Sequence, residues 1–335
     1  MISYDTGDKL ILYSLLMCCI SIVDFILYYV YARKHFVEAR FALSYDRNMF
    51  RKMFSFTSWT FLGQTTSLAA NQGNNILLNI FHGVTANAAM GVGDQVGSAL
   101  MGLSGGFQKA FNPQLTKSFA EKNFVYVKKL LLSASKLSFI LMFICAVPII
   151  YNIDFILKLW LVKIPVGASI FAILFIIQGV VNSLSTPLNF CIVASGEIKL
   201  TQIYSSIVYI FDLVLLYLLF FYGCPPATAA FVKLLIVIID LFVRLHFACQ
   251  YVPSISTYSY CKSVLFPVLI KVSLVIVIYI VFKNTMHGTC GICVATTLLV
   301  IISMLLSFFI TLDSIERCQV KGLVISKLRD INILK

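Results

Sequence analysis

The residues that could do chemistry in this chain are mostly amides at helical spacing, and they gather between residues 64 and 112. A first helix-length segment carries them on one broad face, at Gln64, Asn71, Asn74, Asn75 and Asn79. A second segment, beyond a turn at residues 82–83, carries Asn87, Asp94, Gln95, Gln108 and Lys109. Polar groups inside a bilayer are costly unless they meet a partner or a wet cavity. These faces therefore predict the wall of a polar cavity, and the alternative is a set of contacts that join membrane helices.

Polar residues also interrupt the apolar segments further along. Gln178 and Asn182 are four residues apart, so they predict one more polar face of the same cavity. Asp94 and Asp212 each fall near the middle of a predicted helix. They are the candidates for coupling to a cation or proton, and the alternative is that each carboxylate hydrogen-bonds to neighbouring helices.

Four more charged positions have simpler interpretations. Asp240 and Arg244 are four residues apart on one predicted helix, so we expect them to pair with each other. Lys233 is expected to meet an anionic phosphate or to reach the headgroups, and Lys271 to reach the headgroups.

The sequence carries no arrangement typical of an enzyme. It has no recognisable pairing of nucleophile and base, no histidines at metal-ligand spacing and no glycine-rich phosphate loop followed by Lys-Ser or Lys-Thr. We therefore expect a transporter without catalytic residues, metal or cofactor.

Composition defines the fold class. The chain has 335 residues, of which 60% are hydrophobic and 12% charged, and its mean hydropathy is +0.93. A soluble domain has about 25% charged residues. The pattern predicts an all-α polytopic integral membrane protein. Its net charge of +12 is attributed to cytoplasmic loops and not to nucleic-acid binding.

We predict nine transmembrane helices, at about residues 10–31, 54–81, 84–107, 130–151, 166–193, 202–222, 227–249, 264–282 and 291–312. If the loops alternate sides, twenty Lys and Arg residues fall on one side and four on the other. That asymmetry predicts a cytoplasmic C-terminus. Residues 112–129 are expected to form a basic amphipathic segment on the inner surface, and residues 151–165 a short interfacial helix anchored by Trp160.

Several stretches carry a family resemblance. They are Phe-Ser-Phe-Thr-Ser-Trp at 54–59, Gln-Gly-Asn-Asn-Ile-Leu-Leu-Asn at 72–79, Asn-Ala-Ala at 87–89, Gln95, Phe-Gln at 107–108, Asn-Pro-Gln at 112–114, residues 153–161, Ser-Gly-Glu-Ile-Lys at 195–199 and Gly-Cys-Pro-Pro at 223–226. In these stretches the chain resembles Wzx-type flippases of O-antigen (lipopolysaccharide) and capsule, which belong to a MATE-like superfamily. The resemblance covers nearly the whole chain.

The resemblance implies a function in surface polysaccharide biosynthesis. The substrate would be an oligosaccharide repeat unit on undecaprenyl diphosphate, flipped across the inner (plasma) membrane of a bacterium. The path for its sugar would be lined by Gln64, Asn71, Asn74, Asn75, Asn79, Asn87, Gln95, Gln108, Lys109, Gln178 and Asn182, with Asp94 and Asp212 for ion coupling. Partners would be this lipid-linked oligosaccharide and membrane lipids, and no nucleic acid.

The family layout implies the domain organisation. Residues 1–36 would be the last helix of an N-terminal lobe, residues 37–250 a complete six-helix lobe, and residues 251–335 two additional helices with a basic cytoplasmic tail. About five N-terminal helices of that layout are not in this sequence. The expectation is an N-terminally truncated member that pairs with a missing lobe or a partner chain.

Three alternatives stay open. A cation-coupled small-molecule antiporter of the same superfamily would favour acidic and aromatic cavity residues, whereas here amides outnumber acids. A membrane-embedded glycan polymerase or ligase would need sizeable outer loops with catalytic groups, and residues 151–165 hold little chemistry. An inactive, truncated remnant is the third.

Overall fold

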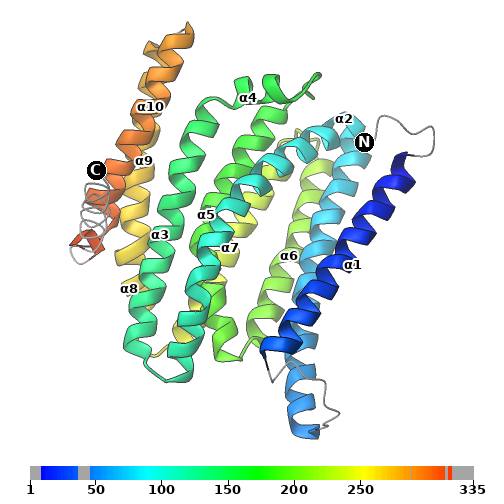
Figure 1. Ribbon diagram of the computed structural model, residues 1–335. Helices are drawn as coiled ribbons and strands as arrows, with labels where there is room; N and C mark the ends of the chain where they lie inside the picture. Colours follow the sequence, from blue (N-terminus) through cyan, green and yellow to red (C-terminus); the bar gives the residue numbers. More distant parts are fainter. Residues whose placement is uncertain (1–8, 37–45, 287, 314–315, 319–335) are drawn as a thin grey trace, which may run out of the picture. The chain divides into compact units, whose positions relative to one another are not determined.

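The computed structural model describes residues 9–36, 46–286, 288–313 and 316–318 (Figure 1). These residues are overwhelmingly helical, and none of them forms a strand. Apolar stretches fold this way because a bilayer offers no partner to backbone N–H and C=O groups, whereas a helix pairs them internally. The all-α prediction is confirmed for the described chain.

The helices follow one another with short connections. In chain order they are α1 (Lys9–His35), α2 (Arg47–Ala120), α3 (Phe124–Tyr151), α4 (Ile153–Trp160), α5 (Ala168–Ser195), α6 (Lys199–Phe221), α7 (Thr228–Tyr251), α8 (Thr257–Tyr260), the π-helical turn η2 (Cys261–Leu265), α9 (Phe266–Thr285), α10 (Gly288–Leu306) and the π-helical turn η3 (Ser307–Thr311).

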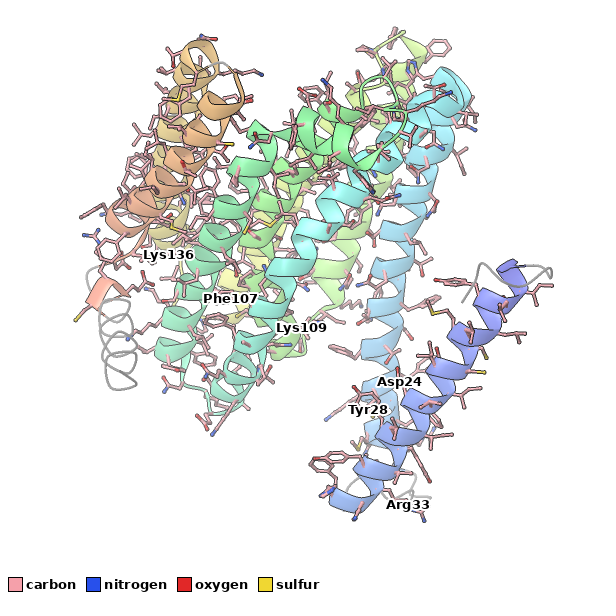
Figure 2. The ribbon with its side chains drawn as sticks, turned by 45° about the horizontal axis from the view of Figure 1, so that its top comes forward. Asp24, Tyr28, Arg33, Phe107, Lys109 and Lys136 are labelled. Atoms are coloured by element: carbon pink, nitrogen blue, oxygen red, sulfur yellow. The ribbon has the colours of Figure 1, made fainter. Side chains whose placement is uncertain are left out.

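The chain divides into two units, residues 1–54 and 55–335. Helix α1 belongs to the first unit, and none of the residues in its most apolar stretch is buried. Asp24, Tyr28 and Arg33 lie along this helix (Figure 2), and Arg33 donates a hydrogen bond of 3.2 Å to the hydroxyl of Tyr29.

Helix α2 is bent at Gly83, where the backbone has φ 79° and ψ 179°. A side chain is disfavoured at this positive φ, so glycine suits the position. The bend separates two halves, residues 47–82 and 84–120, which we call α2a and α2b. It falls at the turn predicted from the sequence.

Helix α2b continues beyond Phe107 and through Pro113 to Ala120. Helix α3 begins at Phe124, where the side chain of Asn123 accepts a hydrogen bond from the backbone N–H of Tyr126. Residues 112–129, which we expected to form a basic amphipathic segment on the inner surface, are therefore not a helix of their own. Those residues form the last turns of α2b, a tight turn and the first turns of α3.

Helix α5 lies at the centre of the second unit and packs against α3 and α7, while α6 packs against α7. Glycines bring α2 close to its neighbours. A Cβ added at Gly93 would stand 2.8 Å from the backbone carbonyl carbon of Phe171 on α5, and one at Gly73 would stand 2.5 Å from the side chain of Leu213 on α6. These close approaches agree with the use of small residues between membrane helices.

Seven helical segments of the described chain are long and apolar enough to cross a membrane. They are Ile11–His35, Arg47–Gly102, Phe124–Tyr151, Ala168–Ser195, Lys199–Phe221, Thr257–Thr285 and Gly291–Thr311. The predicted count of nine differs in two places. Two predicted spans fall within the continuous α2, and α7, which carries Lys233, Asp240 and Arg244, is not among the seven.

The connections of the second unit gather at two ends (Figure 1). The turns between α2 and α3, between α5 and α6 and between α7 and α8 lie at one end. The bend of α2, helix α4 and the turn between α6 and α7 lie at the other. Helices α9 and α10 form a hairpin that packs on α3 through α10.

Candidate functional site

Two polar pairs join the amide face of α2a to the helices behind it. The side-chain amide of Asn74 donates to Oδ2 of Asp212 on α6 at 2.7 Å, and both residues are buried. One turn away, Nζ of Lys233 on α7 donates to Oδ1 of Asn71 at 3.1 Å. The first amide face therefore meets both a carboxylate and an ammonium group within the bundle.

Lys233 stands at the centre of these contacts. Its Nζ lies 5.3 Å from the ring centroid of Phe175 on α5, an arrangement that stabilises a cation. The carboxylates of Asp94 on α2b and Asp212 both interact with it electrostatically. We call Asn71, Asn74, Asp94, Asp212 and Lys233 the central polar cluster.

The central polar cluster brings together four of the predicted path and ion-coupling residues with Lys233, which the sequence analysis had considered separately. Asp94 and Asn71 are exposed, whereas Asn74, Asp212 and Lys233 are buried. The cluster therefore has an open side on α2 and a closed side against α6 and α7. The sequence placed Lys233 inside a predicted span. It did not indicate that Lys233 would bond to Asn71, because the two residues are 162 positions apart.

The remaining predicted path residues divide by burial. Gln108 is buried. The half-buried ones are Asn75, Asn87, Gln178 and Asn182. The exposed ones are Gln64, Asn79, Gln95 and Lys109. Figure 2 shows Lys109 and Phe107 on the C-terminal half of α2b, which continues to Ala120. An exposed amide face on helices as apolar as these needs water or a protein partner in a membrane.

Two surface hollows of the second unit are apolar and lie away from this face. One, of about 390 Å³, is lined by Gly73, Ile76, Leu77, Leu213, Val214 and Tyr217. The other, of about 300 Å³, is lined by Thr296, Thr297, Val300 and Ile301. None of the predicted path residues lines either hollow. The amide face is an open surface in this arrangement of the chain, and not the wall of either hollow.

A second polar group joins α6 and α7. Oδ2 of Asp240 lies 2.7 Å from Nε of Arg244, and its Oδ1 accepts a hydrogen bond of 2.7 Å from Ser205. The prediction that Asp240 and Arg244 pair with each other is confirmed. Because Asp240 is buried and both its oxygens have partners, this group serves the packing of the two helices.

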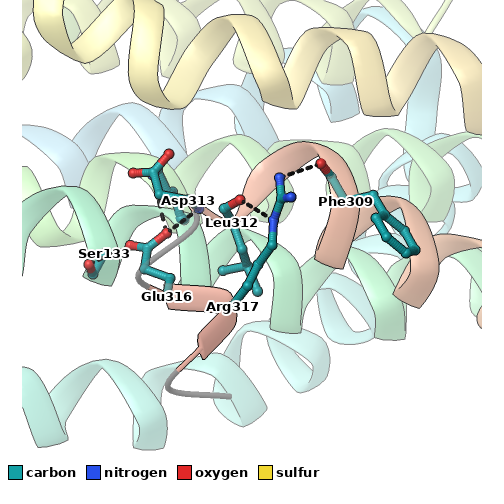
Figure 3. A network of polar contacts seen from close by, with 7 residues as sticks. Ser133, Phe309, Leu312, Asp313, Glu316 and Arg317 are labelled. Carbon is teal, nitrogen blue, oxygen red and sulfur yellow. Dashed lines mark hydrogen bonds and ion pairs between the residues drawn. The ribbon is translucent and has the colours of Figure 1, made fainter. Parts of the chain in front are cut away.

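A third polar group, which the sequence did not reveal, fastens the C-terminal hairpin to α3 (Figure 3). Lys136 has no exposed surface, and its Nζ lies 2.6 Å from Oδ2 of Asp313 and 3.3 Å from Oε2 of Glu316. Ser133 donates to the other carboxylate oxygen of Glu316 at 2.5 Å. Arg317 donates to the carbonyl oxygens of Leu312 and Phe309 and so closes the end of η3.

Lys271 on α9 differs from the expectation that it reaches the headgroups. It is completely buried, and its Nζ donates to the hydroxyl of Ser307 at 2.5 Å. The rings of Phe139 and Phe143 on α3 lie 5.1 Å and 4.4 Å from it. Within the described chain no carboxylate pairs with Lys271. Packing of the hairpin on α3 encloses the ammonium group and leaves it no route to the surface.

No group of His, Cys, Asp and Glu in the described residues could hold a metal ion. The long apolar helices and the polar residues between them define a membrane-embedded protein of the polytopic α-helical class. Comparison with protein-family models, with curated proteins and with solved structures finds no match for this chain.

Proposed function

We propose that this protein is a flippase that moves a lipid-linked oligosaccharide across a bacterial inner membrane. The observation that carries the proposal is the open amide face of α2. Gln64, Asn71, Asn79 and Gln95 are exposed on helices that are otherwise apolar, and Asp94 and Lys233 stand beside them. Amides suit sugars because each one offers a donor and an acceptor to hydroxyl groups.

Under this proposal the polar face admits the sugar headgroup while the lipid tail stays in the bilayer. Lys109, which is exposed, and Lys233, which is buried behind this face, are the cations that we propose for the diphosphate. The two halves of α2 with α3, α5, α6 and α7 correspond to the six-helix lobe of the MATE-like layout, α9 and α10 to its additional pair, and α1 to a helix of the other lobe. Transport in such folds works by the rocking of one bundle against another.

A reconstitution assay tests the proposal. The full chain is inserted into vesicles that contain a fluorescent polyprenyl diphosphate oligosaccharide, and a membrane-impermeant reductant bleaches the label in the outer leaflet. If the protein flips the substrate, bleaching exceeds the outer-leaflet fraction seen in empty vesicles. Equal bleaching with and without protein contradicts the proposal and supports an inactive remnant.

Two controls sharpen the assay. A labelled phospholipid without a sugar should not gain accessibility, which separates specific flipping from general scrambling. The variant Gln95→Leu should slow flipping, whereas Gln250→Leu, an exposed amide at the end of α7, should leave the rate unchanged. Cation-driven efflux of a small drug with no movement of the lipid-linked sugar would favour the antiporter instead.

A further inference from the structure

Helix α4 lies between two long apolar helices and is too short to cross a membrane itself. Its eight residues, Ile153–Trp160, span about 12 Å, whereas the hydrocarbon core is about 30 Å thick. It follows α3 and precedes α5, each of 28 residues and long enough to cross. Helix α4 therefore stands where those helices leave the hydrocarbon core, at one end of the second unit (Figure 1).

One face of α4 is fixed to the bundle. Ile153 and Leu157, four residues apart, are buried in the core. Oδ1 of Asp154 accepts a hydrogen bond of 2.6 Å from Ser169 at the start of α5. These contacts hold the orientation of the helix, so the exposure of its other face is a property of the fold.

The other face presents large apolar side chains. Phe155 and Leu159 are 66% and 80% exposed, and Trp160 is 49% exposed. The connection that follows continues the same surface with Val162, Ile164 and Val166, all exposed. Apolar side chains with a tryptophan at the end of membrane helices are typical of the interfacial layer of a bilayer.

The charges on this surface are positive. Lys158 and Lys163 are both exposed. The acid of the segment, Asp154, is turned to Ser169 by its hydrogen bond. Exposed cations beside an apolar face are complementary to anionic phospholipid headgroups, with the apolar side chains below them in the acyl region.

We infer that α4 and residues 161–166 lie in the headgroup layer and that Lys158 and Lys163 bind anionic phospholipids there. The segment would hold the ends of α3 and α5 at a fixed depth in the membrane. This inference does not depend on the transported substrate.

The two tryptophans of the chain make a direct test simple. The variant Trp59→Phe keeps a ring for the ammonium group of Lys199, 5.1 Å from the Trp59 ring, and leaves Trp160 as the only tryptophan to excite. The full chain is placed in vesicles whose phosphatidylcholine or phosphatidylglycerol carries bromine at the shallow or the deep end of the acyl chain. Shallow bromine should quench Trp160 more than deep bromine or aqueous iodide does.

The headgroup preference tests the two lysines. Each lysine should favour phosphatidylglycerol by roughly fivefold, so brominated phosphatidylglycerol should quench more than brominated phosphatidylcholine at equal mole fraction. Lys158→Gln with Lys163→Gln should abolish this preference but keep the shallow quenching. Lys117→Gln with Lys122→Gln, an exposed pair at the other end of the unit, should change neither.

Three results would overturn the inference. Quenching by iodide but not by lipid would place the segment in water. Quenching by neither would mean that another protein or a second copy covers it. A phosphatidylglycerol preference that survives in the Lys158 and Lys163 variant would mean that these lysines do not bind the headgroup.

Discussion

Asn74 on α2a and Asp212 on α6 share a buried hydrogen bond of 2.7 Å between Nδ2 and Oδ2. The two residues are 138 positions apart in sequence. In the described chain neither Oδ1 of Asn74 nor Oδ1 of Asp212 has a hydrogen-bond partner. The pair therefore depends on one bond, and it joins the amide face of α2a to the helix behind it.

The first prediction concerns this bond. Asn74→Leu leaves the carboxylate of Asp212 buried without a donor, which costs about 1–3 kcal/mol of stability or more for a charged group. The melting temperature of the purified chain in detergent should fall. The thiol of Cys191, which is buried, should react with a fluorescent maleimide at a lower temperature than in the unchanged protein.

The matched control is the double variant Asn74→Leu with Asp212→Leu. Replacing both partners by apolar groups of similar size removes the orphaned carboxylate, so most of the stability should return. A double variant less stable than Asn74→Leu alone would show that Asp212 contributes through some other contact.

The second prediction ranks the two acids that meet Lys136. Glu316→Gln should destabilise the docked hairpin more than Asp313→Asn does, although the Asp313 contact is shorter. The side chain of Glu316 is 11% exposed and accepts from Ser133 and the Asp313 backbone N–H as well, whereas that of Asp313 is 67% exposed. Exposed ion pairs contribute little because water screens them.

The melting temperature of the purified chain in detergent measures the effect of each variant. A larger loss for Asp313→Asn than for Glu316→Gln would contradict the ranking. Ser133→Ala is the intermediate control, because it removes one bond to Glu316 and no charge.

The third prediction compares two glycines on α2b. Gly93→Ala would place a Cβ 2.8 Å from the backbone of Phe171, which cannot yield as a flexible side chain would. We expect a loss of about 1–3 kcal/mol as the helices move apart. Gly91→Ala meets nothing within 4 Å and should be neutral or stabilise by up to about 1 kcal/mol. Equal melting temperatures for the two variants would show that α2b and α5 are not this close.

The sequence predicted those features that depend on local pattern. Apolar length indicated the helices, Gly83 marked the bend of α2, and the spacing of Asp240 and Arg244 predicted their pairing. The short helix before Trp160 was also expected, and α4 ends at that residue. Each of these signals lies within a few residues, where helix geometry decides which side chains meet.

Contacts between residues that are far apart in the chain could not be predicted from the sequence. The sequence around Lys136 did not indicate its partners, which are 177 and 180 positions away. Lys271 was expected to extend to the headgroups because nothing in its own helix showed that α3 and η3 would enclose it. The sequence of residues 112–129 also did not indicate that α2b would continue through Pro113 to Ala120.

The fourth prediction concerns Lys271, whose ammonium group is buried beside hydroxyl and aromatic groups. Lys271→Met should raise the melting temperature, because a buried charge is costly to desolvate and an apolar side chain of similar length can fill its place. Ser307 keeps a partner in the variant, since its hydroxyl also donates to the carbonyl of Ser303. Lys136→Met is the contrasting control and should lower the melting temperature because it orphans Glu316. A fall for Lys271→Met would show that its contacts with Phe139 and Phe143 outweigh desolvation.

The last prediction concerns ion coupling at Asp94, under the flippase proposal. Asp94→Asn keeps the shape of the side chain but removes the charge that acts on Lys233, so a coupled cation or proton loses its carboxylate. The rate of transport in the vesicle assay should fall at least tenfold, which corresponds to about 1.4 kcal/mol in the barrier. Membrane insertion and the melting temperature should stay near those of the unchanged protein. Glu121→Gln, an exposed acid in the turn after α2b, is the control and should transport normally. Unchanged transport by Asp94→Asn would remove Asp94 from the coupling role and leave Asp212 as the acid to test next.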